Sequence, residues 1–171
     1  MRIRRKHIRN VVAALLEKHN IEQAPIDVRR IAANEGFQVI PVSADDSMSG
    51  FLDQKDGAKT IGLNDRNSPN RQRFTIAHEL GHAFLHASKP LYFDEALKFR
   101  NKISEEGTQL EEIEANLFAA ELLMPQNFLE SDFEEIVWFD IDDSKDIQEL
   151  ADKYQVSQQA MTIRLGYLEL L

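Results

Sequence analysis

The segment RQRFTIAHELGHAFLH, residues 71–86, contains an H-E-x-x-H pattern that runs from His78 to His82. Two histidines four positions apart lie on one face of a helix, about 40° apart around its axis. At that spacing both imidazoles can bind one Zn²⁺, and Glu79 between them can act as a general base without being a ligand. The pattern therefore predicts a metal-dependent hydrolase, and most simply a peptidase. By chance alone it is expected in roughly one chain of this length in several hundred, so we favour the functional interpretation.

The sequence around the motif has clear helix boundaries. Ser68 is a good N-cap, and Pro69 suits the first helical position. Pro90 prevents the helix from continuing far beyond residue 87. We therefore expect one continuous helix that begins at Pro69 and ends near residue 86 or 87.

The rest of the chain predicts a mainly helical α+β protein. Strands are expected at residues 37–42, 50–53 and 60–63, and an Asp-Gly turn joins the last two. These strands would form a small antiparallel sheet beside the motif helix, and the hairpin at residues 50–63 can offer an edge strand to an extended peptide. Further helices are expected at residues 8–16, between 27 and 36, at 110–124 and in two stretches within 146–171.

Composition narrows the class of protein. With 43% hydrophobic and 29% charged residues, the 171-residue chain resembles an ordinary globular protein. It has no cysteine, so only His, Asp and Glu are available as metal ligands. The apolar run at residues 11–16 is too short for a signal peptide or a membrane span, which predicts a cytoplasmic protein without a membrane partner. The net charge of −9 disfavours broad nucleic-acid binding.

A catalytic zinc site needs a third protein ligand. On a continuous helix His86 lies about 12 Å along the axis from His78, too far to share one ion, so we interpret His86 as a residue at the pocket edge or in packing. The expected helix at residues 110–124 offers Glu112 with Asn116 one turn later, a ligand and a group that can orient a histidine. Glu114 stays open as the alternative ligand.

The C-terminal residues have the outline of a helix-turn-helix, in which the second helix begins at Ser157. Residues 140–171 contain seven acidic and three basic side chains, a net charge of −4. Phosphate contacts require the opposite sign, so direct DNA binding is not expected. We predict a main domain at residues 1–139 and a helix-turn-helix-like segment at residues 140–171 that packs on it.

Two motifs together resemble the ImmA/IrrE family of metallopeptidases. One is residues 71–82 followed by Leu85-His86, and the other is EIEANLFAAELLMP at residues 112–125. The resemblance extends over about residues 8–171. It implies a zincin-like, more narrowly gluzincin-like, core in which His78, His82 and Glu112 bind the metal and Glu79 is the catalytic base.

The resemblance also implies a substrate. Members of this family cleave a partner repressor of the Xre helix-turn-helix type, which gives an anti-repressor role in a mobile element, a prophage or a stress response. The ligand set suits Zn²⁺, although Mn²⁺ also fits because no soft ligand excludes it. The sequence leaves the oxyanion-stabilising group open among His86, Tyr92 and Arg73. The alternative function is a non-proteolytic, metal-containing binding module or a toxin-like partner of such a regulator.

Overall fold

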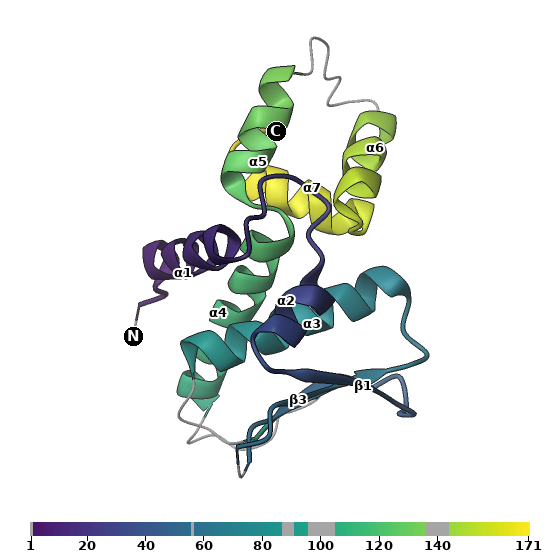
Figure 1. Ribbon diagram of the computed structural model, residues 1–171. Helices are drawn as coiled ribbons and strands as arrows, with labels where there is room; N and C mark the ends of the chain where they lie inside the picture. Colours follow the sequence, from purple (N-terminus) through teal and green to yellow (C-terminus); the bar gives the residue numbers. More distant parts are fainter. Residues whose placement is uncertain (1, 56, 87–90, 96–104, 136–143) are drawn as a thin grey trace.

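The predicted motif helix, α3 (Pro69–Leu85), lies between a small sheet and a layer of helices (Figure 1). The computed structural model describes residues 2–55, 57–86, 91–95, 105–135 and 144–171. The other helices are α1 (Arg5–Lys18), α2 (Val28–Asn34), α4 (Glu105–Leu123), α5 (Gln126–Glu135), α6 (Ser144–Tyr154) and α7 (Gln158–Tyr167). The strands are β1 (Gln38–Val42), β2 (Met48–Asp53), β3 (Thr60–Asn64) and β4 (Leu91–Glu95). This confirms the α+β class. Within the described ranges no helix is both long and apolar enough to cross a membrane.

The sheet has the strand order β1-β3-β2-β4 and is mixed. The hairpin of β2 and β3 is antiparallel, as the sequence predicts, with Gly50 opposite Leu63. The expectation that the whole sheet is antiparallel is wrong, because β3 inserts beside β1 in parallel, with Gln38 opposite Thr60. A turn signal specifies only the pairing of the two strands that it joins, whereas the neighbour of β1 depends on long-range packing. The described edge strands are β1 and β4, so the hairpin strands are interior and do not offer the expected edge.

The boundaries of α3 follow from its sequence. The Ser68 hydroxyl accepts a hydrogen bond from the Arg71 backbone N–H at 3.3 Å, and Pro69 occupies the first turn. The helix ends at Leu85, where the His86 backbone N–H still donates to the His82 carbonyl at 2.9 Å. The predicted helix is therefore correct at both ends to within about one or two residues.

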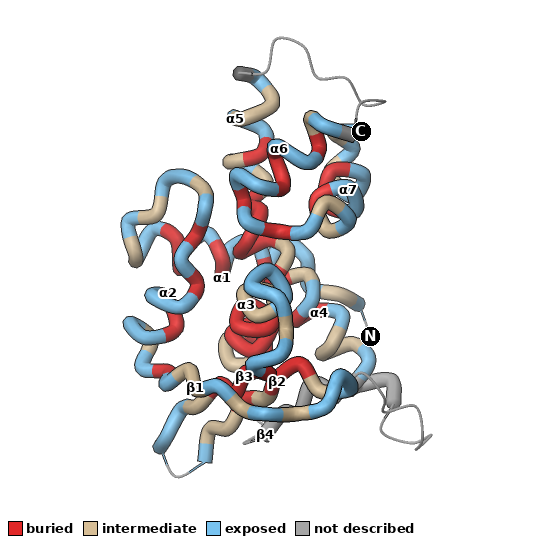
Figure 2. Tube along the Cα trace, turned by 90° about the vertical axis from the view of Figure 1, so that its right-hand side faces the viewer, coloured by how far each residue is buried: buried red, intermediate tan, exposed pale blue. Residues whose placement is uncertain are grey.

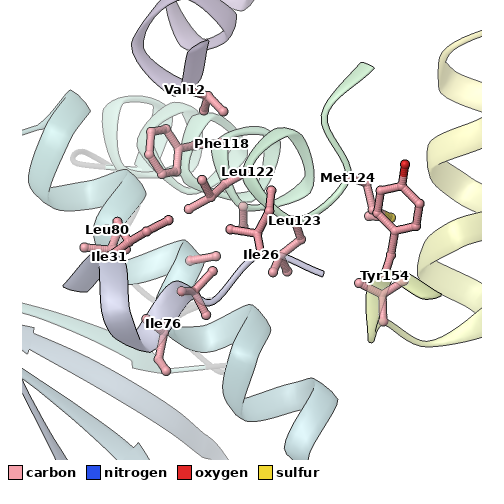
Figure 3. Packing of buried hydrophobic residues seen from close by; sticks show 14 of the residues in the cluster. Val12, Ile26, Ile31, Ile76, Leu80, Phe118, Leu122, Leu123, Met124 and Tyr154 are labelled. Atoms are coloured by element: carbon pink, nitrogen blue, oxygen red, sulfur yellow. The ribbon is translucent and has the colours of Figure 1, made fainter. Parts of the chain in front are cut away.

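The central part of α3, residues 75–82, is buried, and Figure 2 shows it in red between the sheet and the remaining helices. Ile76 and Leu80 are completely excluded from solvent. Figure 3 shows them close to Ile31 of α2 and Leu122 of α4. Burying each such aliphatic side chain contributes about 1.5–3 kcal/mol, so this layer of contacts holds the motif helix in a fixed position.

Two arginines connect the C-terminal helices with the rest of the protein. Arg73 of α3 donates to the carbonyl oxygens of Tyr154 and Gln155, at 3.3 and 3.2 Å, and so caps the C-terminus of α6. Arg164 of α7 is buried, pairs with Glu121 and donates to the Met124 carbonyl at 3.0 Å. The boundary expected between residues 139 and 140 lies outside the described residues, and the division into two domains stays a prediction.

The contact between α3 and the sheet leads to a stability prediction. A Cβ on Gly50 of β2 would lie 2.5 Å from both the Gly62 carbonyl oxygen and the Thr75 methyl group. Gly50→Ala must therefore displace backbone, and we expect it to lower the free energy of unfolding by about 1–3 kcal/mol in urea titrations. The matched control is Gly166→Ala in α7, where no heavy atom lies within 4 Å and alanine favours helix by about 0.5–1 kcal/mol. Equal free energies of unfolding for Gly50→Ala and Gly166→Ala would contradict the close packing of Gly50 against Gly62 and Thr75.

Candidate metal centre

The site forms where α3 and α4 cross at close range. At Gly81 of α3 an added Cβ would come within 3.1 Å of the Ala115 Cα and carbonyl oxygen. The small residues at this crossing therefore allow the two helix backbones to approach each other. Glu112 lies almost one turn before Ala115 on α4, and His78 and His82 flank Gly81 on α3. The crossing thus brings residues 30 or more positions apart to one place.

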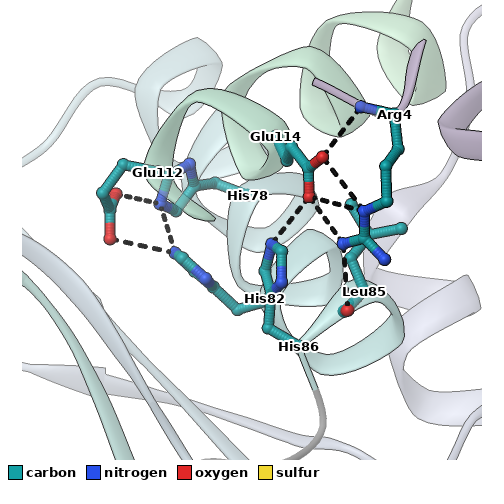
Figure 4. Close-up of polar contacts among 7 residues, drawn as sticks. All are labelled: Arg4, His78, His82, Leu85, His86, Glu112 and Glu114. Carbon is teal, nitrogen blue, oxygen red and sulfur yellow. Dashed lines mark hydrogen bonds and ion pairs between the residues drawn. The ribbon is translucent and has the colours of Figure 1, made fainter. Parts of the chain in front are cut away.

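Three side chains converge beside this crossing, as Figure 4 shows. The Nε2 atoms of His78 and His82 lie 3.0 Å apart. The two carboxylate oxygens of Glu112 lie 3.3 Å from these nitrogens, one oxygen to each ring. One ligand atom from each residue falls within 4.8 Å of the others, so the group can hold a single metal ion.

The geometry fits a tetrahedral divalent cation. Zinc bonds of 2.0–2.1 Å place neighbouring ligand atoms about 3.3 Å apart, close to the separations of 3.0 and 3.3 Å found here. Two imidazole nitrogens and a carboxylate that face one point also create a negative potential, which a cation relieves. The donor set and its spacing therefore agree with a His₂Glu metal site.

Asn116 fixes the orientation of one imidazole. Its Oδ1 lies 3.1 Å from His78 Nδ1. In the neutral ring, Nδ1–H donates to this oxygen, and Nε2 then has the free lone pair that a metal ligand requires. Asn116 is therefore placed as the sequence suggested, one turn after Glu112 and in contact with a histidine. Glu79 is completely buried on the same helix as the two histidines.

The Glu112 carboxyl is ionised at neutral pH. Burial by itself raises the pKa of Glu112, but hydrogen bonds from His78 and His82, together with their positive charge when protonated, outweigh burial. The pKa of Glu112 is therefore lowered to about 2. The carboxylate is the form that binds a divalent cation.

Glu114 belongs to a second cluster. Its carboxylate accepts hydrogen bonds from the Arg4 backbone N–H at 2.9 Å and from Arg4 Nη2 at 2.6 Å (Figure 4). Arg4 Nη2 also lies 3.4 Å from the Leu85 carbonyl oxygen, at the last residue of α3. Of the two glutamates that the sequence left open, the structure brings Glu112 to the imidazoles and places Glu114 on Arg4.

His86 borders this second cluster and lies outside the group of three. Its Nε2 is 3.6 Å from a Glu114 carboxylate oxygen, and its ring centroid is 5.8 Å from that of His82. Burial lowers the pKa of His86 below its usual range, against the opposing effect of the Glu111 and Glu114 carboxylates. The neutral ring is thus favoured, and His86 lies at the end of α3 beside the site.

Of the other two residues that the sequence suggested for oxyanion stabilisation, the structure describes the side chain of Arg73 alone. Arg73 is hydrogen-bonded to the C-terminus of α6. Tyr92 pairs with Leu52 in the sheet register, and its side chain lies outside the described part of the structure. Sequence reasoning missed Arg4, because nothing in a basic N-terminal segment indicates a partner 110 positions away.

An H-E-x-x-H helix that crosses a second helix bearing a glutamate, beside a small sheet, defines the zincin-like class of metallopeptidase folds. Comparison with known families agrees with this class. The sequence model of the IrrE N-terminal-like domain, peptidase family M78, matches residues 32–166, and the chain belongs to this family.

Two known proteins illustrate the relationship. An uncharacterized immunity region protein 2 from Bacillus phage phi105 is 33% identical over 97 residues, which cover 56% of this chain and 56% of the phage protein. The chain thus matches little more than half the length of that relative. The solved structure of a Mycobacterium tuberculosis transcriptional regulator superposes with a TM-score of 0.64 at 16% identity, covering 94% of this chain and 47% of the other. That likeness concerns the fold.

The Arg4–Glu114 contact predicts a stability effect at the N-terminus. Glu114 is 1% exposed and the Arg4 side chain 45% exposed, so Arg4→Ala leaves a buried carboxylate without its charged donor. We expect a loss of about 1–2 kcal/mol in the free energy of unfolding, measured by urea denaturation. Arg9→Ala is the control, because its hydrogen bond to Gln126 is exposed and its removal should not change stability measurably. If both variants unfold like the wild type, the contact does not stabilise the protein.

Proposed function

We propose that this chain is a zinc-dependent endopeptidase in which His78, His82 and Glu112 hold the metal. The supporting observation is the convergence of these three ligand atoms within 4.8 Å of one another on two packed helices. Membership in peptidase family M78 supports the same activity. Mn²⁺ is the alternative ion, since the three ligands do not discriminate strongly between the two metals.

In this proposal each residue of the site has a separate task. The bound cation would supply Lewis acidity that polarises the scissile carbonyl and acidifies water. Glu79, buried beside both histidines, accepts a proton from the attacking water and passes it to the leaving amine. Asn116 keeps His78 in the tautomer that leaves Nε2 available as a ligand.

We further propose that the substrate is a partner repressor of the Xre helix-turn-helix type. The relative from the Bacillus phage is named as an immunity region protein, which supports a role for this family in controlling a regulator. Cleavage of such a repressor would make this chain an anti-repressor that acts by proteolysis. Direct DNA binding is not part of this proposal, because the net charge of −9 opposes phosphate contacts.

The role of Asn116 is tested by metal affinity. Asn116→Ala removes the acceptor that fixes the His78 ring, and we expect the dissociation constant for Zn²⁺ to rise by about 10–100-fold in competition with a chelating dye. Asn127→Ala, at an exposed asparagine of α5, is the control and should bind Zn²⁺ like the wild type. Equal affinities for the three proteins would exclude an orienting role for Asn116.

The catalytic base is tested by Glu79→Gln. This variant should retain Zn²⁺ but cleave the repressor encoded by a neighbouring gene at a rate lower by about 10²–10⁴-fold, followed by mass spectrometry. Glu17→Gln, an exposed site on α1, should cleave like the wild type. Added chelator should stop cleavage by the wild type.

Other outcomes of this assay would argue against the proposal. Full activity of Glu79→Gln would exclude Glu79 as the base. Stable binding of the repressor without cleavage, by metal-loaded wild-type protein, would favour the non-proteolytic binding module instead.

A further inference from the structure

The N-terminal helix carries a charge opposite to that of the rest of the chain. Residues 1–10 contain five of the 20 basic residues and none of the 29 acidic ones. The remaining 161 residues therefore have 15 basic and 29 acidic side chains, a net charge of −14. Such a basic region on an acidic protein attracts negatively charged partners.

Two arginines of this region line a pocket between α1, α4 and α7. The pocket has a volume of about 330 Å³, and its walls include Arg5 and Arg9 of α1 and Tyr167 of α7. Arg5 lies over the Tyr167 ring, with Cζ 5.4 Å from the ring centroid, and Arg9 donates to the neutral side chain of Gln126. Among the described residues neither Arg5 nor Arg9 forms an ion pair, so both charges remain available to a partner.

The remaining walls of the pocket set its character. Ile8, Leu117 and Leu168 supply apolar surface. The buried charge of Arg164 is balanced by Glu121, and Glu169 contributes one further negative charge. The pocket is therefore mainly polar, with an apolar wall on part of its surface and a small excess of positive charge that comes from α1.

An exposed apolar stripe on α7 continues this surface. Ile163 is 65% exposed and Tyr167 44% exposed, and their spacing of four places both on one face of the helix. Large exposed aliphatic side chains beside a pocket are typical of protein contact sites rather than of DNA contacts. The only basic residue of α7, Arg164, is buried in its pair with Glu121 and cannot reach a phosphate.

We propose that Arg5, Arg9, Ile163 and Tyr167 form a docking surface for an acidic, amphipathic segment of the protein substrate. An apolar side chain of that segment would contact the apolar wall of the pocket, and flanking carboxylates would pair with the two arginines. The inference rests on the proposed function only where it calls the docked protein a substrate. The four residues are distinct from the three that form the metal cluster, so docking can be measured without cleavage.

The probe is a fluorescein-labelled synthetic helix of about 18 residues with leucines on one face and flanking glutamates. A second peptide replaces every glutamate with lysine. Fluorescence anisotropy with the full-length Glu79→Gln protein should show saturable binding of the glutamate peptide, much weaker binding of the lysine peptide and a loss of affinity at high salt. Equal binding of the two peptides would overturn the proposal.

Charge reversal identifies the surface. Arg5→Glu combined with Arg9→Glu should weaken binding of the glutamate peptide by about tenfold or more, and Ile163→Ser by about fivefold. Lys55→Glu reverses one charge in the exposed β2–β3 turn, half the charge change of the double variant. It should bind the peptide within about twofold of the protein without surface substitutions. Glutamates in the first turns of α1 favour the helix dipole, and circular dichroism should confirm folding of the double variant. Unchanged binding by a folded double variant would refute the docking surface.

Two further measurements separate the competing explanations. If a DNA duplex binds and displaces the glutamate peptide, the surface belongs to nucleic acid and the proposal is overturned. If light scattering shows a dimer that the arginine reversals dissociate, the surface is a contact with a second copy, and the proposal is likewise overturned. Cleavage of a short, unanchored peptide tests the proposed function independently, because the double variant should retain that activity when Glu79 and the metal cluster are intact. Docking without any cleavage would leave the surface supported and reject only the peptidase activity.

Discussion

The close crossing of α3 and α4 is the constraint on which the rest of the structure depends. Gly81 and Ala115 lie face to face, and a methyl group on Gly81 would already come within 3.1 Å of the opposing backbone. Because the helices approach so closely, His78 and His82 on one helix reach Glu112 on the other at 3.3 Å. The sheet and α2 then cover α3 on its other sides and hold the crossing in place (Figure 1).

Two glutamates that are two positions apart on α4 have different partners, and both are ionised. Glu112 faces the histidines and stays ionised because they stabilise its negative charge more than burial opposes it. Glu114 is turned toward Arg4, and the hydrogen bonds and charge of that arginine lower the pKa of Glu114 despite its burial. Arg4 also approaches the last carbonyl of α3, so the N-terminus connects both helices of the site. A segment at the N-terminus thereby connects the two helices that carry the candidate metal ligands.

The C-terminal helices contribute through contacts that a DNA-binding segment would not need. Arg73 joins the motif helix with α6, and Arg164 joins α7 with the end of α4. Both arginines are used within the protein, which leaves α7 with an exposed apolar stripe beside the basic α1. The helix-turn-helix outline therefore describes the local shape of this segment, and it does not by itself indicate DNA binding.

Local sequence determined much of this protein. The N-cap at Ser68, the four-residue spacing of His78 and His82 and the proline after α4 specify the helices and the pair of imidazoles, because helix geometry depends only on neighbouring residues. Tertiary structure alone decided which glutamate joins them, that β1 pairs with β3 in parallel, and that Arg4 binds Glu114 across 110 positions. Glu112 and Glu114 have the same chemistry, but they lie about 200° apart around the axis of α4. Which of these two faces of α4 meets the histidines depends on the angle and closeness of the helix crossing, and these depend on side-chain packing between segments far apart in the chain.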